Sequence, residues 1–518
     1  MGRNIYKYVA VIGIDGMGNF NLNTATPNMD RIFENGATAT HALSMDPTIS
    51  AENWGAMLLG LTPVTHGLTN SALGHLEYKN EAFPSVFKRI RKEFPDSYIA
   101  SYSKWNPINI GLVEHGLNVD TQTADNDILL CDKIIDAVAN KPKFLFVQFD
   151  NVDGAGHHSG YGNEEHLNKI TETDGHVGRI YDAYKKAGII DDTLFLVIAD
   201  HGGYFHSHGG YMDTEKFVFF GAAGKGVAKS SIDYMRTVDI AAIVLYALGI
   251  DMPEYNERAF ASQIPENLFD DHSAKYSRPV AKPFIPEFKK TVPFDSENGL
   301  ANIMGGDRIK LCMFFDNELK DETGKNKLEE VGTVKYYSDG VRGSRGEFGL
   351  TGSVQIPTLK LTEKSFSISL WIKIDRSLER EAVILATKCW CEHRDYNGIV
   401  LTLRRNDTLL NIGCGDDDFE FITPFPDDIS DGWVHAAFVI DKENMRLKLY
   451  YNFKEAHTTV IEPQYAVALD GIGFRLGDDS CGEWNSFNLE QIVNIDDLII
   501  FDGVLCESDI EKLEQYYK

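Results

Sequence analysis

Three short segments of the sequence place carboxylates and imidazoles close together. The first is GIDGMG, which contains Asp15. The second is FDNVDGAGHHSG, where Asp153 and His157 stand four residues apart in a predicted Gly-rich turn, and the third is IADHGGYFHSHGG, with Asp200 and His201. Mixed Asp and His ligands suit zinc, or less often manganese, better than calcium or magnesium, which prefer oxygen shells. Together the segments predict a transition-metal site, although a single Asp after a strand is usually a cap or turn residue.

A hydroxyl side chain supplies a candidate nucleophile. Ser50 stands just before a predicted helix whose small and apolar face includes Trp54. A hydroxyl at a helix N-terminus is most often only a cap. Near metal ions the same hydroxyl has a lowered pKa and forms an alkoxide, and the helix N-terminus favours a phosphoryl anion. Thr48 is the competing hydroxyl, and the spacing alone does not separate the two.

The elements that must position these residues follow from the hydrophobic pattern of residues 5–265. Short runs of Val, Ile and Phe alternate with amphipathic helical periods, which predicts a doubly wound, mostly parallel α/β sheet. Ligands of such sheets bind beyond the carboxyl ends of the strands, where the three segments converge. The predicted strands are 8–14, 98–102, 144–149, 194–199 and 217–220. The predicted helices are 27–34, 52–59, 84–92, 128–139, 164–187 and 238–248.

The motifs, in this order, resemble the alkaline phosphatase superfamily. They are most similar to its type I phosphodiesterase/nucleotide pyrophosphatase branch and bacterial relatives. The resemblance covers about residues 5–250 and rests on Asp15, PTIS ending at Ser50, LGLTPxxHG from Leu59, DxxxH from Asp153 and DHGG from Asp200. The segment TVDIAAIVLYALGI is similar to the helix that closes the core of these proteins. The resemblance implies a hydrolase of phosphoric esters that uses two divalent ions, zinc or alternatively manganese.

The resemblance also implies a role for individual residues. The nucleophile of the family stands ten residues before the glycine of its T-G-L-Y-P-like turn, and counting back from Gly60 gives Ser50, where relatives often carry Thr. The DHGGxxxxHGG spacing favours His208 over His206 as the last ligand. Asn70 falls one position short of the asparagine that binds a phosphoryl oxygen. One ion would be held by Asp15, Asp200, His201 and Ser50, and the other by Asp153, His157 and His208.

The implied mechanism has two steps through a phosphoseryl intermediate at Ser50, and no cofactor besides the two metal ions. Phosphodiesters are the favoured substrates, because a phosphomonoesterase typically adds a cation and only Lys104 could reach for that role. A phosphoryl-transferring member of the superfamily is a further alternative. A sulfatase is disfavoured, because the run from Ser50 to Trp54 lacks the C/S-x-P-x-R motif. His66 and His158 are interpreted as structural or as supporting the ligands.

The second half of the chain has a different texture. Residues 279–293 carry four prolines and read as a connector. Later segments with period-2 alternation predict an antiparallel β-sandwich, which resembles a laminin-G-like, concanavalin A-like jelly roll. We expect Trp371 and Trp433 in its core. The predicted domains are a metallohydrolase domain at 1–270, a proline-rich linker at 271–308 and the sandwich at 309–518.

The motifs of the second domain do not indicate its function. We expect this domain to bind a carbohydrate or a protein, or to shape the entrance of the active site. The acidic clusters at 416–418 and 478–479 are interpreted as solvated loop tips, with calcium binding as the alternative. A different function class also stays open, in which the whole chain is a glycan- or partner-binding protein with an inactive hydrolase domain.

Composition limits the partners. The chain has 518 residues, with 77 acidic and 50 basic side chains and a formal net charge of −27. This charge repels nucleic-acid polymers and anionic membranes, which leaves a small-molecule or glycan-linked phosphate ester as the expected substrate. No transmembrane segment or signal peptide is recognised, so we expect a cytoplasmic protein. The seven cysteines, scattered through the chain, are expected to be reduced thiols.

Overall fold

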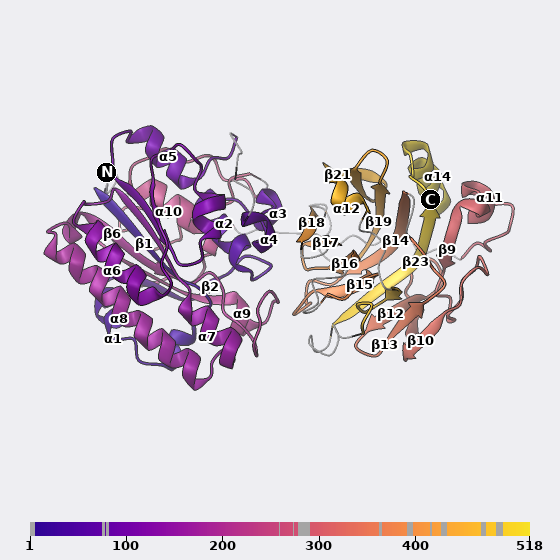
Figure 1. The fold of residues 1–518 in the computed structure, drawn as a ribbon, viewed down its shortest axis with the longest axis horizontal. Helices are drawn as coiled ribbons and strands as arrows, with labels where there is room; N and C mark the ends of the chain where they lie inside the picture. Colours follow the sequence, from indigo (N-terminus) through magenta and orange to yellow (C-terminus); the bar gives the residue numbers. More distant parts are fainter. Residues whose placement is uncertain are drawn as a thin grey trace. The chain divides into compact units, whose positions relative to one another are not determined.

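The chain divides into two compact units, Met1–Pro279 and Val280–Lys518, and each is described by itself (Figure 1). The computed structural model describes residues 6–74, 78, 82–257, 259–272, 274–277, 291–361, 365–390, 397–414, 417–425, 432–467, 473–482 and 491–518. Most of the predicted connector lies outside these residues. Within the predicted linker, Phe294, Leu300 and Met304 are buried in an apolar cluster of the second unit. The second unit therefore includes residues well before 309.

The first unit is built on a mostly parallel sheet. The neighbouring strands β3, β5, β1 and β6 are parallel, and the runs that form β5, β1 and β6 are buried almost throughout because helices cover both faces. This agrees with the predicted doubly wound fold. In spatial order the strands are β4 (Asp120–Gln122), β3 (Ile99–Ser103), β5 (Phe144–Phe149), β1 (Tyr8–Ile14), β6 (Thr193–Ile198), β7 (Phe217–Ala223), β2 (Ala37–Leu43) and β8 (Ser230–Ser231).

Two groups of helices cover the sheet, and Figure 1 shows α6 and α8 on the opposite side from α5 and α10. Each predicted helix is present, and its bounds lie within about two residues of the predicted ones. The first group is α1 (Pro27–Phe33), α6 (Asp127–Val138), α7 (Asn151–Ser159) and α8 (Glu164–Lys186). The second group is α2 (Ser50–Leu59), α5 (Val86–Glu93) and α10 (Ile240–Ala247). Shorter helices are α3 (Pro63–His66), α4 (Asn70–Leu73) and α9 (Asp213–Lys216).

Two local predictions are wrong. The segment after β5 was expected to be a Gly-rich turn, but it forms helix α7, which ends at Gly160 with φ 101°. Asp153 and His157 therefore lie on the same face of a helix, one turn apart. Strand β2 was not predicted, because its alternating Ala and Thr residues form no apolar run; it pairs antiparallel with β7.

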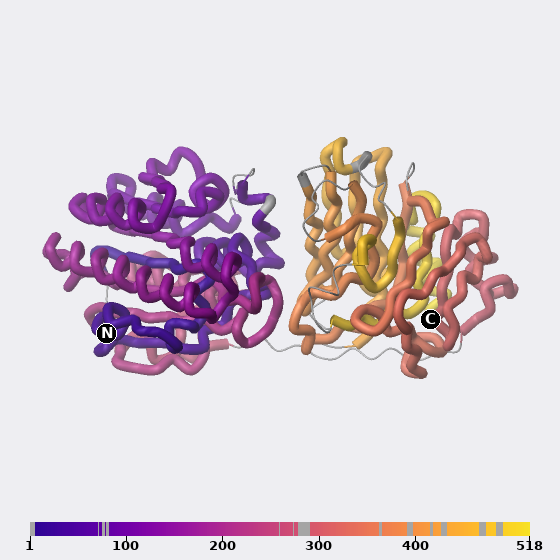
Figure 2. Tube along the Cα trace, turned by 60° about the horizontal axis from the view of Figure 1, so that its bottom comes forward, coloured from indigo at the N-terminus to yellow at the C-terminus, as the bar shows by residue number. Residues whose placement is uncertain are grey.

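The second unit is all antiparallel, as expected for a jelly roll. Its strands run up and down beside one another in the orange-to-yellow part of the tube (Figure 2). Trp371 and Trp433 are buried in its core, as predicted. In spatial order the strands are β18 (Asp417–Pro424), β17 (Asp407–Cys414), β16 (Gly398–Leu403), β15 (Ala382–Ala386), β22 (Phe474–Leu476), β13 (Gly352–Ile356), β12 (Arg345–Gly349), β23 (Ile492–Asp502), β14 (Phe366–Ile374), β19 (Gly432–Asp441), β20 (Arg446–Tyr451) and β21 (Lys454–Val460).

Further short elements complete this unit. Strand β10 (Glu329–Gly332) pairs with β13, β11 (Lys335–Tyr337) with β12, and β9 (Ile309–Met313) with β23. The helices are α11 (Leu300–Met304), α12 (Pro463–Val467) and α14 (Glu507–Tyr517), and α11 packs against α14. In the part of the chain that the structure describes, no helix combines the length and apolar character needed to cross a membrane.

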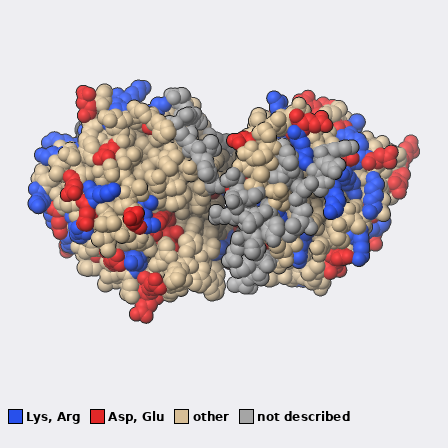
Figure 3. All heavy atoms as spheres, viewed as in Figure 1, with Lys and Arg blue, Asp and Glu red and all other residues tan. Residues whose placement is uncertain are grey.

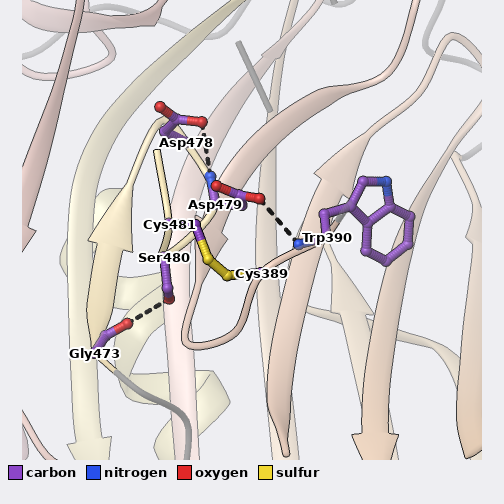
Figure 4. Close-up of a disulfide and its surroundings, with 7 residues drawn as sticks. All are labelled: Cys389, Trp390, Gly473, Asp478, Asp479, Ser480 and Cys481. Atoms are coloured by element: carbon purple, nitrogen blue, oxygen red, sulfur yellow. Dashed lines mark hydrogen bonds between the residues drawn. A yellow bond between two sulfur atoms is a disulfide. The ribbon is translucent and has the colours of Figure 1, made fainter. Parts of the chain in front are cut away.

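A disulfide joins Cys389 and Cys481, whose Cα atoms are 5.3 Å apart (Figure 4). The expectation of reduced thiols is therefore wrong for this pair. Asp479, from one predicted acidic cluster, accepts a hydrogen bond from the Trp390 backbone N–H (3.0 Å), and Asp478 accepts one from the Asp479 N–H. These two carboxylates thus order the turn beside the disulfide. Asp416, in the other cluster, lies outside the described residues.

Candidate active site

The carboxyl ends of adjacent parallel strands bring the three predicted segments together. Ile14 at the end of β1 is in register with Phe149 at the end of β5, and Gly13 with Ile198 at the end of β6. Asp15 directly follows β1, and Asp200 follows β6 after one residue. One residue, Asp150, also separates β5 from α7. The ends of the strands therefore lie level, which places the carboxylates at one edge of the sheet.

Two groups of side chains at this edge have the spacing of metal ligands. Asp153, His157 and His208 form one group, and Asp15, Asp153 and His201 form the other, each with its ligand atoms within 4.8 Å of one another. Asp200 adjoins the second group, with Oδ2 3.4 Å from His201 Nε2. The six predicted metal-ligating Asp and His residues thus meet at one site, and Asp153 faces both groups.

Backbone carbonyls orient the three imidazoles. His157 Nδ1 lies 2.8 Å from the His206 carbonyl, His201 Nδ1 2.8 Å from the Gly202 carbonyl, and His208 Nδ1 2.9 Å from the Thr48 carbonyl. A carbonyl only accepts, so each Nδ1 carries a hydrogen, and in the neutral imidazole that binds a metal each Nε2 has a lone pair. Each Nε2 is the atom that approaches the carboxylates, which is the arrangement of imidazoles that bind a metal.

Two carboxylates of this site each have a buried oxygen without a hydrogen-bond partner among the described residues. Asp200 Oδ1 accepts hydrogen bonds from the backbone N–H groups of Gly16 (3.1 Å) and His201 (2.8 Å). Asp200 Oδ2 and Asp15 Oδ1 are buried and have no hydrogen-bond partner among the described residues. Both oxygens lie 3.4 Å from His201 Nε2. Buried anionic oxygens without donors are costly unless a cation compensates them, so this donor set fits a divalent ion.

The electrostatics of the carboxylates agree with this fit. Burial, with the nearby charges of Asp200 and Asp153, raises the pKa of Asp15 well above its usual range. Burial likewise raises the pKa of Asp200 to about 6. Burial would also raise the pKa of Asp153, but the hydrogen bond from His157 and the charges of His208 and His201 lower it overall. The site therefore concentrates negative charge that the protein itself compensates only in part.

Glycine is required at one point of this packing. Gly16 has φ 68°, a conformation that side chains rarely adopt, and a Cβ there would lie 2.6 Å from Asp153 Oδ1. The His166 ring bonds to the Gly16 carbonyl at 3.2 Å and to the Gly162 N–H. The glycine thus lets the turn after β1 approach the helix that carries Asp153.

Ser50 is the first residue of α2 and faces the site. Its Oγ lies 3.1 Å from His201 Nε2. The competing hydroxyl of Thr48 is fully buried, donates to the Gly210 carbonyl at 2.7 Å and accepts from the Gly209 N–H at 3.0 Å. Asn70 Oδ1 accepts a hydrogen bond from the Ala51 N–H at 2.9 Å, which places this amide beside the N-terminus of α2.

The remaining predicted residues lie around this centre. His206 contributes its carbonyl to His157, and its own Nδ1 bonds to the His157 carbonyl at 3.2 Å. His66 joins the Glu52 carbonyl of α2 to the Leu68 N–H, and burial lowers its pKa to about 4. His158 is exposed. Lys104, one residue after β3, forms a 2.7 Å ion pair with Asp150.

Three residues with contacts to the carboxylates carry no signal in the sequence pattern. The Tyr161 hydroxyl donates to Asp153 Oδ1 at 2.5 Å. Trp54 Nε1 and Gln148 Nε2 both donate to Asp15 Oδ2, at 3.0 and 2.8 Å. Trp54 was assigned only to the apolar face of its helix, and Gln148 is a single polar residue inside a buried strand. Their polar contacts depend on tertiary packing, which the spacing of residues does not encode.

Comparison with protein families confirms both resemblances. Residues 9–84 and 71–214 match the model of the type I phosphodiesterase / nucleotide pyrophosphatase family. Residues 348–511 match that of the concanavalin A-like lectin/glucanases superfamily. The first match supports the resemblance on which the expectation of a phosphoric ester hydrolase rests. No curated protein matches the chain.

Several solved structures are similar to parts of the chain at low identity. Murine ectonucleotide pyrophosphatase/phosphodiesterase 5 is 14% identical over 48% of this chain and 97% of its own, with a TM-score of 0.41. The binding domain of botulinum neurotoxin serotype D/C is 16% identical over 41% of this chain, with a TM-score of 0.33. The binding domain of Paraclostridial Mosquitocidal Protein 1 is 18% identical over 41%, with a TM-score of 0.34. The chain spans about half the length of each of these two binding domains, 53%.

Proposed function

We propose that the first domain hydrolyses phosphodiesters with Ser50 as nucleophile and two divalent ions, preferably zinc, as cofactors. The observation that carries this proposal is the convergence of Ser50 Oγ, three Nε2 atoms and two buried, unpaired carboxylate oxygens at one edge of the sheet. Asp15, Asp200 and His201 would hold one ion together with Ser50. Asp153, His157 and His208 would hold the other. When bound, such ions lower the pKa of hydroxyl groups and neutralise phosphoryl oxygens.

The chain's own residues would act in two displacements. Ser50 Oγ attacks phosphorus, its proton passes to solvent, and the bond from phosphorus to the first ester oxygen breaks as that oxygen leaves as an anion. Water then attacks the phosphoseryl group and frees Ser50. The positive end of the α2 helix dipole, at whose first residue Ser50 stands, favours the anionic phosphoryl group. Asn70 would orient the phosphoryl group, because its amide is fixed beside the Ala51 N–H.

The pairing of Lys104 supports diesters over monoesters. A monoester carries an additional negative charge, for which a free cation near the phosphoryl group is useful. Lys104 Nζ instead contacts Asp150 at 2.7 Å, and Asp150 also accepts from Gln148. Its charge is therefore already balanced by a neighbour.

The test is the turnover of bis-p-nitrophenyl phosphate and of p-nitrophenyl phosphate by the zinc-loaded protein. We expect faster cleavage of the diester, loss of turnover with chelator and in Ser50→Ala, and retained turnover in Ser50→Thr, which keeps the hydroxyl. Thr48→Ser is the matched control, because it preserves the hydrogen bonds to Gly209 and Gly210. Faster cleavage of the monoester would instead support a phosphatase, and an active Ser50→Ala would remove Ser50 as nucleophile.

The alternative of an inactive hydrolase domain predicts a different result. A protein that only binds glycans or partners has no need of a complete ligand set, whereas all six predicted ligands meet in this site. Metal analysis after reconstitution with zinc separates the two, since the inactive protein would retain no ion. Carbohydrate or protein binding by the second domain stays a prediction.

A further inference from the structure

One oxygen of Asp15 is held by two neutral donors inside the protein. Asp15 Oδ2 accepts from the indole Nε1 of Trp54 at 3.0 Å and from the amide Nε2 of Gln148 at 2.8 Å. All three side chains are almost completely buried, with at most 1% exposed. The other oxygen, Oδ1, has no hydrogen-bond partner among the described residues and lies 3.4 Å from His201 Nε2. The carboxylate therefore presents a single free oxygen to the site.

The amide of Gln148 can point in only one direction. Its Oε1 accepts from the Trp105 backbone N–H at 2.8 Å. A backbone N–H only donates, so the oxygen must lie on that side and the NH₂ group on the other. The NH₂ group then donates to Asp15 and to Asp150 Oδ1, at 3.0 Å. Strand β5 thus fixes a donor against Asp15.

The indole of Trp54 is fixed by packing. Its ring lies so close to β1 that a Cβ at Gly13 would be 2.4 Å from it, and it meets the ring of Phe146 edge-on with centroids 5.7 Å apart. A tryptophan confined in this way keeps its N–H aimed at Asp15 Oδ2. Two separate elements, α2 and β5, therefore hold the same oxygen.

We propose that Trp54 and Gln148 are positioning residues that make Asp15 a one-oxygen ligand, through Oδ1, of the ion shared with Asp200 and His201. The inference deepens the proposed function and rests on its metal site. Both donors are neutral, so they orient the carboxylate without cancelling the charge that attracts a cation. A lysine or arginine in their place would compete with the ion instead. Supporting hydrogen bonds of this kind typically change metal affinity by about 10–100-fold.

The experiment compares zinc binding by the full chain and by Gln148→Met, Gln148→Glu and Trp54→Phe, in competition with a chromophoric chelator. Gln148→Met removes the donor at similar length, and Gln148→Glu keeps the shape of the side chain but replaces the NH₂ group by an oxygen. We expect each variant to bind one of two zinc ions about 10–100-fold more weakly.

Ser101→Ala is the matched control. Ser101 is buried in the neighbouring strand β3 and donates to Asn109 at 2.8 Å, so its loss removes a buried hydrogen bond that does not touch a carboxylate of the site. Its zinc affinity should equal that of the parent. The inference is overturned if all three variants bind zinc as tightly as the parent, or if Ser101→Ala weakens binding equally. A parent protein that binds no zinc would instead refute the proposed function itself, together with this inference.

Discussion

At the scale of single residues, the second ion site has its own supporting donor. Tyr161 OH donates to Asp153 Oδ1, and the ring is packed against His157 and His208 with centroids 5.7 and 6.3 Å away. The hydroxyl stays protonated, because burial and the Asp153 charge raise the pKa of Tyr161 far above its usual value. Tyr161 therefore supports Asp153 as a neutral donor.

We predict that Tyr161→Phe lowers zinc affinity by about 10-fold or more, because it removes this donor and leaves the ring in place. Titration with zinc in competition with a chelator measures the change. Tyr184→Phe is a suitable comparison, since this tyrosine is buried and its hydroxyl has no hydrogen-bond partner among the described residues. Equal affinities of Tyr161→Phe and the parent would contradict the assigned role.

Residue type and spacing predict the ligands better than their supports. The Asp and His motifs follow buried parallel strands. Because the carboxyl ends of such strands lie at one edge of the sheet, the convergence of these motifs could be predicted from the topology. Tyr and Trp often pack in or near protein cores and Gln148 is a lone polar residue of a buried strand, so only the packing around α7, α2 and β5 shows which atom each of them faces. The resemblance favours Ser50 over Thr48 by the count back from Gly60, whereas the hydrogen bonds that occupy the Thr48 hydroxyl are visible only in the structure.

At the scale of elements, a helix replaces a predicted turn. The glycines of NVDGAGHHS suggested a loop, but α7 buries Val152, Ala155 and Gly156, and its capping Gly160 ends it. A Cβ at Gly156 would overlap the Tyr161 ring, so the glycine serves the approach of that ring rather than a turn. Tertiary packing thus outweighs the low helix propensity of glycine.

The disulfide closes a loop of the sandwich with a sequence separation of 92 residues. We predict that Cys389→Ser/Cys481→Ser lowers the free energy of unfolding of this domain by about 2–4 kcal/mol. Urea unfolding followed by circular dichroism gives the difference, and Cys506→Ser, at an exposed free cysteine, is the control. An unchanged midpoint would show that the bond adds no stability.

The sandwich core contains a histidine whose protonation opposes folding. His435 on β19 stacks on Phe453 with centroids 4.1 Å apart, bonds to the Ser369 hydroxyl at 2.9 Å, and has its pKa lowered to about 3 by burial. The unfolded chain binds this proton near pH 6.5, and the folded domain only near pH 3. Stability therefore rises with pH in this window and is lost on acidification, by at most about 1.4 kcal/mol per pH unit.

Accordingly, His435→Gln should show a shallower dependence of the free energy of unfolding on pH between 4 and 6 than the parent domain. Urea unfolding at several pH values provides both slopes, and their difference isolates this group from the buried carboxylates. Parallel slopes would mean that His435 takes up its proton equally in both states.

At the scale of the whole molecule, acidic and basic side chains lie intermixed on the face seen in Figure 3, although the net charge is −27. Asp15 and Asp200 of the active site are buried. The net charge of the protein therefore repels a phosphate ester, whereas bound cations would make the site itself attract it. The composition predicts repulsion of polyanionic partners, but it does not locate such a site.

Because the chain forms two compact units, we predict that the thermal unfolding of each unit responds separately to metal removal. Chelation should lower the unfolding temperature of the first domain, because it leaves buried carboxylates uncompensated, and should leave that of the sandwich unchanged. The loss is about 4 kcal/mol if free zinc was about 1,000-fold above its Kd. Differential scanning calorimetry with and without chelator measures both transitions. A shift confined to the sandwich would contradict the location of the ions.

The central claim is that Ser50 forms a covalent bond to phosphorus, and the stereochemical course of hydrolysis tests it most directly. The substrate is a single stereoisomer of a phosphorothioate diester, hydrolysed by the zinc-loaded protein in water enriched in heavy oxygen. Two successive in-line displacements, first by Ser50 and then by water, predict overall retention of configuration at phosphorus. Inversion would show that water attacks the substrate directly and would contradict the account.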